Sequence, residues 1–299
     1  MSRISLQQLK SFLLAPTLFL LPLLTPNLVN AAVKIKDTNY GIPNNAYFVS
    51  PKGKDNNSGK SPGSPLTVER AIAVAPPGST IVFRGGVYRD VDAKITKKLT
   101  LQAYPREKPL LKGSTIVEGW VADGRTWRKD GWNHSFPQNM GNVYIDPKYP
   151  LAGHRDMVYV NGESLKQVGN KANVKPGTFY VDGRNNKLYI GSNPAGKTVE
   201  ATTKEMAFGL LSTRQFSASG TKIRGLGFAH YAEDAVEIMK TNNVTLENNT
   251  FVWNGLRGAS FRESSDAIVR GNIFSYNGMH GVRAGKSSRF LIEGNTGSS

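Results

Sequence analysis

A repeat of 23 residues in the C-terminal third constrains the fold more than any other feature of the chain. The stretch LENNTFVWNG (246–255) is followed 23 positions later by VRGNIFSYNG (269–278). Adding 23 aligns three columns of equivalent residues: Ile223, Leu246, Val269 and Ile292; Phe228, Phe251 and Phe274; and Asn249, Asn272 and Asn295. A fixed period of roughly 20–30 residues indicates a solenoid, built from leucine-rich repeats, helical repeats or parallel β-helix coils.

Short alternating runs inside each unit favour a β solenoid. The runs NVTLE, TFVW and ASFRE are separated by Asn, Gly and Ser, and no stretch of the repeat has the pattern of an amphipathic helix. Alternation over a few residues is typical of strands, and the separating residues are typical of turns. Each coil is therefore predicted to hold three strands and three turns.

The asparagine column predicts a ladder inside the coils. Asparagine tolerates the left-handed backbone of a tight bend, and its amide can reach the neighbouring coil about 4.8 Å away. We expect Asn272 to be buried and to hydrogen-bond along the coil axis to Asn249 and Asn295. Asn254 begins an Asn-Gly pair, which predicts an exposed turn that tolerates substitution.

With these columns, the chain resembles the right-handed parallel β-helix proteins of the pectate-lyase-like superfamily. The stretch YFVSPKGKDNNSGKSPGSPLTVERAIAVAPPGSTIVFRGGVYRD (47–90) is similar to their start: a strand, a polar loop, a capping helix near 66–75 and a first coil. LTLQAYPREKPLLKGS (99–114) resembles a further coil. The resemblance implies an all-β, right-handed parallel β-helix with 23-residue coils, an N-terminal cap helix and an inserted small β domain.

The period disappears in the middle of the chain. Residues 118–205 contain hairpin signals at Asn161-Gly162 and between Gly183 and Asn186, and several tryptophans. We predict a signal peptide (1–31), a cap with the first coils (32–117), the inserted β domain (118–205) and further coils (206–299). Gly297 stands where the Phe column would continue, and no cap follows, so we expect the coils to be truncated there.

The N-terminus predicts export. Arg3 and Lys10 precede an apolar run (12–24), and a small-residue cleavage site ends at Ala31. A membrane anchor is the alternative, but this run is interrupted by two prolines and is short of the roughly 20 residues that a spanning helix needs. We expect a secreted, periplasmic or cell-surface protein without a membrane span after cleavage. The chain has no cysteine, so its stability cannot depend on disulfides.

The net charge indicates an anionic partner. The chain carries +16, and removal of Arg3 and Lys10, with no acid lost, leaves +14 for the mature form. Outside the cytosol, an anionic polysaccharide is a more accessible partner than nucleic acid, which we do not expect to be bound. Solubility is the alternative reason for such a charge. We expect a monomer.

The resemblance implies that activity lies outside the strand that follows the longest turn, here DAVEIM, RGASFRE and HGVRAG. Its columns are Asp234, Arg257 and His280, then Glu237, Ser260 and Arg283. Paired carboxylates can act as acid and base or nucleophile on a glycosidic bond, whereas Arg or His can remove the α-proton of an acidic sugar. We predict catalytic roles for Asp234, Glu237 and His280, and substrate binding by Arg257, Arg262 and Arg283. A solvated polar side chain is the alternative for each.

Two other sets of columns are interpreted as structural. Opposite charges alternate at Arg224, Glu247, Arg270 and Glu293, and at Lys240, Glu263 and Lys286, as a stacked sheet requires to avoid repulsion. A binding track is the alternative. His230, Trp253 and Tyr276 follow the Phe column in phase, so we expect them to pack inward, although aromatic faces also bind sugars.

Motifs for other chemistries are absent from the sequence. It has no G-x-S-x-G elbow, phosphate loop or H-E-x-x-H, and its four histidines lack metal spacing. The resemblance makes Ca²⁺ a possible cofactor, but no aspartate cluster forms a clear site, and no metal ligand is predicted. Our hypothesis is an exported enzyme that cleaves an anionic polysaccharide as a lyase or glycoside hydrolase. The alternative is a non-catalytic cell-surface or glycan-binding β-helix.

Overall fold

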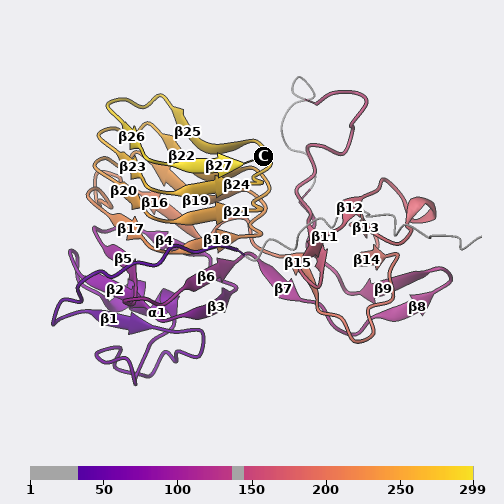
Figure 1. Cartoon of the computed structure of the whole chain (residues 1–299), viewed down its shortest axis with the longest axis horizontal. Helices are drawn as coiled ribbons and strands as arrows, with labels where there is room; N and C mark the ends of the chain where they lie inside the picture. The colour runs from indigo at the N-terminus through magenta and orange to yellow at the C-terminus, as the bar shows by residue number, and fades with distance from the viewer. Residues whose placement is uncertain (1–32, 137–144, 299) are drawn as a thin grey trace, which may run out of the picture. The chain divides into compact units, whose positions relative to one another are not determined.

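The structure of the protein is a computed structural model that describes residues 33–136 and 145–298. Most of these residues form stacked coils of parallel strands, and an antiparallel β region is inserted among them (Figure 1). The predicted signal peptide, 1–31, lies outside the described residues. Within the two described ranges, no helix is both long and apolar enough to cross a membrane.

Three parallel sheets run along the stack of coils. The strands of the first sheet are, in spatial order, β1 (Tyr47–Val49), β2 (Thr80–Phe83), β5 (Thr100–Ala103), β17 (Lys222–Arg224), β20 (Thr245–Glu247), β23 (Ile268–Arg270) and β26 (Leu291–Glu293). Those of the second are β3 (Gly86–Arg89), β6 (Pro109–Lys112), β18 (Gly227–Ala229), β21 (Thr250–Val252), β24 (Ile273–Ser275) and β27 (Thr296–Ser298). Those of the third are β4 (Ala93–Ile95), β16 (Phe208–Leu211), β19 (Asp234–Met239), β22 (Arg257–Arg262) and β25 (His280–Gly285).

The pairing register follows the sequence repeat. Lys222 pairs with Thr245, which pairs with Ile268, so equivalent residues of successive coils lie side by side. Inside the coils, the rings of Phe228 and Phe251 stack with centroids 4.9 Å apart, and the next pair in the column is 5.0 Å apart. The predicted fold, a right-handed parallel β-helix of the pectate-lyase-like superfamily, is confirmed.

A short helix, α1 (Val68–Val74), lies within the range where the sequence predicts one. The hydroxyl of Thr67 accepts a hydrogen bond from the backbone N–H of Arg70 and so caps its first turn. Val68, Ala71 and Ile72 are buried and join the core that fills the coils. The helix is therefore held by its apolar face at the β1 end of the stack.

The first corner of each coil, between the first and second sheets, carries the predicted asparagine ladder. Asn248 (φ 53°) and Gly271 (φ 63°) have left-handed backbones at this corner. The side-chain amide of Asn249 donates to Oδ1 of Asn272 (3.1 Å), and that of Asn272 donates to Oδ1 of Asn295 (3.0 Å). Asn272 is fully buried, so the prediction for this residue is confirmed.

The second corner, between the second and third sheets, carries another ladder. The side-chain amide of Asn254 donates to Oδ1 of Asn277 (2.9 Å), and its Oδ1 accepts the N–H of Tyr231 (3.2 Å). Asn254 is only 1% exposed. The prediction of an exposed Asn-Gly turn was wrong, because the left-handed backbone of Trp253 (φ 55°) turns the following residue inward.

The same left-handed residues explain a second correction. His230, Trp253 and Tyr276 have φ values of 65°, 55° and 53°, so the alternation of the preceding strand ends at this corner. Trp253 and Tyr276 stack on each other 4.6 Å apart, and Tyr276 is 41% exposed. The interpretation of the column as inward core was therefore wrong for these two aromatic residues.

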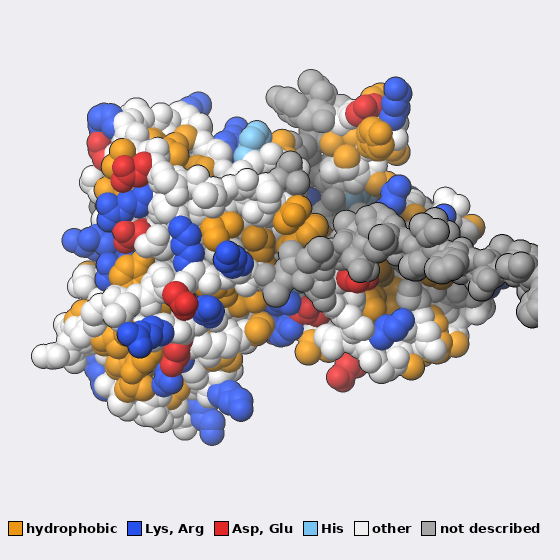
Figure 2. All heavy atoms as spheres, in the orientation of Figure 1, with side chains coloured by type: hydrophobic (Ala, Val, Ile, Leu, Met, Phe, Trp, Pro, Cys, Tyr) orange, Lys and Arg blue, Asp and Glu red, His pale blue; other side chains and the backbone are white. Residues whose placement is uncertain are grey.

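Opposite charges meet on the first sheet, as the alternating column predicts. Arg270 and Glu247 form an ion pair of 2.7 Å. Figure 2 shows Lys or Arg and Asp or Glu side chains interspersed over the side of the coils where β17, β20, β23 and β26 lie. This arrangement supports the structural interpretation of the column.

The inserted region interrupts one coil between β6 and β16, at the second corner. Its first sheet consists of β7 (Ser114–Ile116), β15 (Val199–Thr202), β10 (Val158–Val160) and β11 (Glu163–Ser164). Its second sheet consists of β8 (Val121–Asp123), β9 (Thr126–Asp130), β14 (Lys187–Ile190), β13 (Thr178–Asp182) and β12 (Lys166–Gln167), and a 3₁₀ turn, η2, spans Lys171–Asn173. A separate apolar cluster that includes Val158, Phe179 and Leu188 fills it. Its strands begin at Ser114, four residues before the predicted start.

Candidate functional site

The candidate site lies on the outer face of the third sheet. Val236 and Ala259 point into the core, so their neighbours Glu237 and Ser260 point outward. Asp234 pairs with Arg257, and Ser260 with Arg283, across adjacent coils. The 23-residue register thus gathers charged side chains from β19, β22 and β25 on one surface.

A groove of about 530 Å³ opens on this surface. We call it the groove; five of the six predicted site residues line it, namely Asp234, Glu237, Arg257, Arg262 and Arg283. The sequence analysis assigned no role to its other polar lining residues, which are Glu233, Ser260, Glu263 and Lys286. Glu263 and Lys286 had been interpreted only as members of a charge column.

Asp234 and Arg257 form a buried ion pair at the base of β19 and β22. Nη1 of Arg257 donates to both carboxylate oxygens of Asp234, at 3.0 and 3.3 Å. The two side chains are only 12% and 9% exposed. Nε of Arg257 is buried and has no hydrogen-bond partner in the described part of the chain. Because both oxygens of Asp234 are engaged, this carboxylate is well placed to orient Arg257 in the groove.

Glu237 is the more accessible carboxylate of the predicted pair. Nη2 of Arg262 lies 2.9 Å from its Oε1, and the side chains of Arg262 and Glu237 are 58% and 23% exposed. The other carboxylate oxygen has no printed partner among the described residues. An exposed arginine is easily displaced, since a surface ion pair contributes only about 0–1 kcal/mol. Glu237 can therefore meet a ligand at little cost.

Two cations of the groove are left without an acidic partner. Asp234 and Glu237 pair with arginines inside the groove, and Glu263 lies 4.0 Å from Lys240. Arg283 and Lys286 form no ion pair within the described residues, and both are exposed. The charges that remain available to a ligand on this lip are therefore positive.

The inserted region reaches the groove through Arg155. Its Nη1 lies 2.5 Å from Oε1 of Glu233, a groove residue that directly precedes β19. Glu233 belongs to the second corner, and the insertion interrupts the same corner one coil earlier, where Glu205 accepts the backbone N–H of Glu233. No periodic signal links 155 to 233, which is why sequence reasoning missed this contact.

His280 lies apart from the other predicted site residues. It pairs in register with Arg257, but its exposed side chain lines a different cavity of about 460 Å³, together with Tyr276 and Met279. Its predicted catalytic role stays a prediction.

His230 lies in a buried network where the insertion joins the coils. Its Nδ1 is 2.8 Å from Oγ of Ser114, and the ring of Tyr159 stacks on it at 3.7 Å. Burial, and then the nearby charges of Lys112 and Arg89, hold the pKa of His230 well below its usual value. The imidazole is therefore neutral at pH 7.

The same two cations neutralise Glu200, which belongs to β15. Arg89 lies 2.6 Å and Lys112 lies 2.8 Å from its carboxylate oxygens. Burial alone would raise the pKa of Glu200, but its bonds to Lys112 and Arg89 outweigh burial and lower the pKa. This carboxylate thus stays ionised and fastens β15 of the insertion to β3 and β6 of the coils.

Metal binding receives no support from the side chains of the described ranges. No group of three or more His, Asp or Glu residues there is arranged to hold a metal ion. The carboxylates of the groove are engaged with arginines instead. No residue of the site is therefore assigned to Ca²⁺.

Comparison with known proteins agrees with the fold. Residues 211–299 match the family model described as "Right handed beta helix region". The chain is similar to a solved complex of XylC with xylose (16% identity, TM-score 0.59, 80% of this chain and 56% of that one). It is also similar to a glycoside hydrolase (14%, 0.55, 77% and 66%) and to pectate lyase Pel9A (13%, 0.46, 85% and 48%). No curated protein sequence matches. The chain spans 56% and 66% of the first two structures, and identities this low establish the fold alone.

Proposed function

Taking the right-handed parallel β-helix as the fold, we propose that this protein is an exported enzyme that cleaves an anionic polysaccharide in the groove. The observation that carries the proposal is the accessible carboxylate of Glu237 beside Asp234 and the arginines of the same surface. Two proteins of similar fold are named for a xylose complex and for a glycoside hydrolase, which agrees with a carbohydrate substrate. The apolar N-terminal run and the lack of cysteine agree with export.

The groove offers the groups that such a cleavage requires. The unpaired cations Arg283 and Lys286 can bind the carboxylates of an acidic sugar, because a guanidinium or ammonium pairs strongly with them. Glu237 can exchange a proton with the scissile bond, and Asp234 can hold Arg257 against the substrate. In a hydrolase, the two carboxylates would flank the bond. In a lyase, a base such as His280 or an arginine would remove the α-proton.

The test is an assay of the full-length product on a panel of acidic and neutral polysaccharides. Hydrolysis gives new reducing ends without unsaturation, whereas elimination gives unsaturated ends as well. We expect cleavage of a polyuronate and not of neutral xylan. Absence of both kinds of product across the panel would contradict an enzymatic function.

A non-catalytic glycan-binding protein is the second candidate. It is favoured by the fact that both predicted catalytic carboxylates are engaged in ion pairs with arginine. The double variant Asp234→Ala, Glu237→Ala separates the two functions when retention on an immobilised polysaccharide is measured beside turnover. Retention that survives in a protein without turnover supports binding, and loss of an existing turnover supports catalysis.

A further inference from the structure

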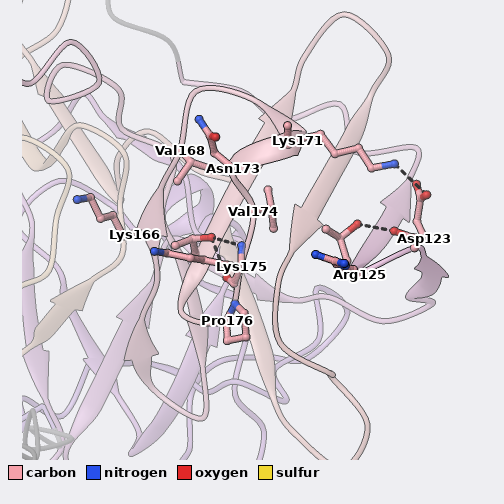
Figure 3. A pocket seen from close by; sticks show the side chains of 13 residues that line it. Asp123, Arg125, Lys166, Val168, Lys171, Asn173, Val174, Lys175 and Pro176 are labelled. Atoms are coloured by element: carbon pink, nitrogen blue, oxygen red, sulfur yellow. Dashed lines mark hydrogen bonds and ion pairs between the residues drawn. The ribbon is translucent and has the colours of Figure 1, made fainter.

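The inserted region contains a second surface depression, distinct from the groove. It has a volume of about 1210 Å³ and lies between the turn that joins β8 to β9, strand β12 and the loop through η2 (Figure 3). We call it the hollow. Figure 3 shows Arg125 on one side of it, Lys166 and Lys175 on the other, and Val174 between them.

Local hydrogen bonds hold the segments that surround the hollow. Gly124 takes the left-handed backbone of the β8–β9 turn (φ 64°) and so presents Arg125 at the tip. Asn170 caps η2 by accepting the N–H of Asn173 (3.1 Å). The hydroxyl of Thr178 accepts the N–H of Lys175 and donates to its carbonyl, both at 2.8 Å. The hollow is thus framed by bonded turns.

The charges of the hollow are predominantly positive. Four cations line it, Arg125, Lys166, Lys171 and Lys175, against one carboxylate, Asp123. That carboxylate is already engaged, because Lys171 lies 2.8 Å and Arg128 lies 2.9 Å from its oxygens. The hydrogen bond from Lys171, and then that from Arg128, lowers the pKa of Asp123.

Three cations remain without an acidic partner. Arg125, Lys166 and Lys175 are exposed and form no ion pair within the described ranges. Like charges gathered around one depression repel each other, and an anion placed among them relieves that repulsion. The floor is partly apolar, with Val168 and the buried Val174.

We infer that the hollow binds the carboxylate or sulfate groups of an anionic polysaccharide. Guanidinium forks and ammonium groups are the cations that recognise such oxyanions, and an apolar floor accommodates the C–H face of a sugar ring. A polysaccharide fits better than nucleic acid, because no aromatic side chain lines the hollow to stack a base. With its only carboxylate engaged, the hollow is a site for holding a chain. This inference does not depend on the function proposed for the groove.

The test compares the wild-type protein with the triple variant Arg125→Gln, Lys166→Gln, Lys175→Gln. Binding to polygalacturonate, dextran sulfate and neutral xylan is measured by titration calorimetry at low ionic strength. We expect the triple variant to bind its preferred polyanion about tenfold more weakly, because three exposed charge contacts are lost. An unchanged melting temperature checks that the variant is folded. The polyanion that binds more tightly distinguishes carboxylate from sulfate recognition.

A charge-matched control decides whether the position of the cations matters. The triple variant Lys54→Gln, Lys148→Gln, Lys197→Gln removes the same charge from exposed positions that do not line the hollow. Retained affinity in this control supports the inference. An equal loss in both variants, tighter binding of a single-stranded oligonucleotide, or no polyanion binding by the wild type would overturn it. The readout is binding and not product, so the result stands whether or not the groove cleaves anything.

Discussion

The groove of the coils and the hollow of the inserted region differ in how their charges are paired. In the groove, acids and bases alternate, and two carboxylates, Asp234 and Glu237, lie beside arginines with only Arg283 and Lys286 left over. In the hollow, the one carboxylate is engaged and three cations are left over. A site with an accessible carboxylate can exchange protons, whereas a site with cations alone can only attract and hold an anion.

The two regions also differ in how their side chains are positioned. Each groove residue sits on a strand whose neighbours are set by the 23-residue register and by ladders at the corners. The hollow is framed by turns and has no repeat beneath it. Substitutions in the coils should therefore affect stability strongly, and substitutions around the hollow should affect it little.

The largest effect is expected for Glu237→Gln. The amide keeps the shape but cannot exchange a proton, so turnover of the cleaved polysaccharide should fall by roughly 10²- to 10⁴-fold. The matched control is Glu293→Gln, an exposed glutamate of the first sheet outside the groove. Initial rates with both variants measure the effect. Turnover that persists in Glu237→Gln would remove the catalytic distinction between the groove and the hollow.

The next largest effect is expected for Arg257→Met. It leaves the buried carboxylate of Asp234 without a partner, which should lower the free energy of unfolding by about 3–5 kcal/mol. Arg262→Met, in the exposed pair, should lower it by at most about 1 kcal/mol. Denaturant titrations at pH 7 compare the two. Similar losses would mean that the Asp234 pair is solvated and not a fixed part of the groove.

The ladders below the groove predict a smaller loss. Asn254→Leu and Asn272→Leu each orphan buried amide partners, at about 1–3 kcal/mol for each unsatisfied group. Asn173→Leu, at an exposed position of the hollow, should change stability by no more than about 0.5 kcal/mol. Thermal melts of the three variants test the difference. A loss at Asn173 as large as at Asn254 would contradict the structural contrast between the two regions.

The smallest effect concerns the junction between the two regions and depends on pH. The folded pKa of His230 lies well below 6.5, its ordinary value, so below pH 6.5 the unfolded chain binds a proton that the folded chain does not. Stability should therefore fall as the pH falls, by at most about 1.4 kcal/mol per pH unit for this residue.

His230→Gln should weaken this dependence, and His280→Gln, at an exposed position, should not. The measurement is the difference in unfolding free energy between pH 7.5 and 5.5 for each variant. An unchanged difference in His230→Gln would show that the junction does not keep this imidazole neutral.

The periodic part of the sequence predicted the structure well, because a constant register carries information from one coil to the next. The Phe stack, the Asn272 ladder and the outward residues of the third sheet all follow from adding 23. Prediction failed at the corners, where a left-handed residue such as Trp253 reverses the inside-outside alternation and turns Asn254 inward. That φ value depends on the stack and not on the local sequence.

Contacts between distant, aperiodic segments could not be predicted at all. The pairing of Arg155 with Glu233 and the packing of Tyr159 on His230 both join the insertion to the coils. No pattern within either segment refers to the other, because the insertion has no period. For the same reason, the cations around the hollow come from three separate segments that the sequence does not relate.

The constant register makes 23 residues a unit of growth. Duplicating one unit in the gene would add a coil, lengthen the surface by one strand spacing of about 4.8 Å, and keep every side chain on its original face. An extra segment one residue longer or shorter would turn the following strands inside out, unless a corner absorbed the difference. Evolution, or an engineer, can thus adjust the reach of this surface in discrete steps, and each step copies the charges of an existing coil.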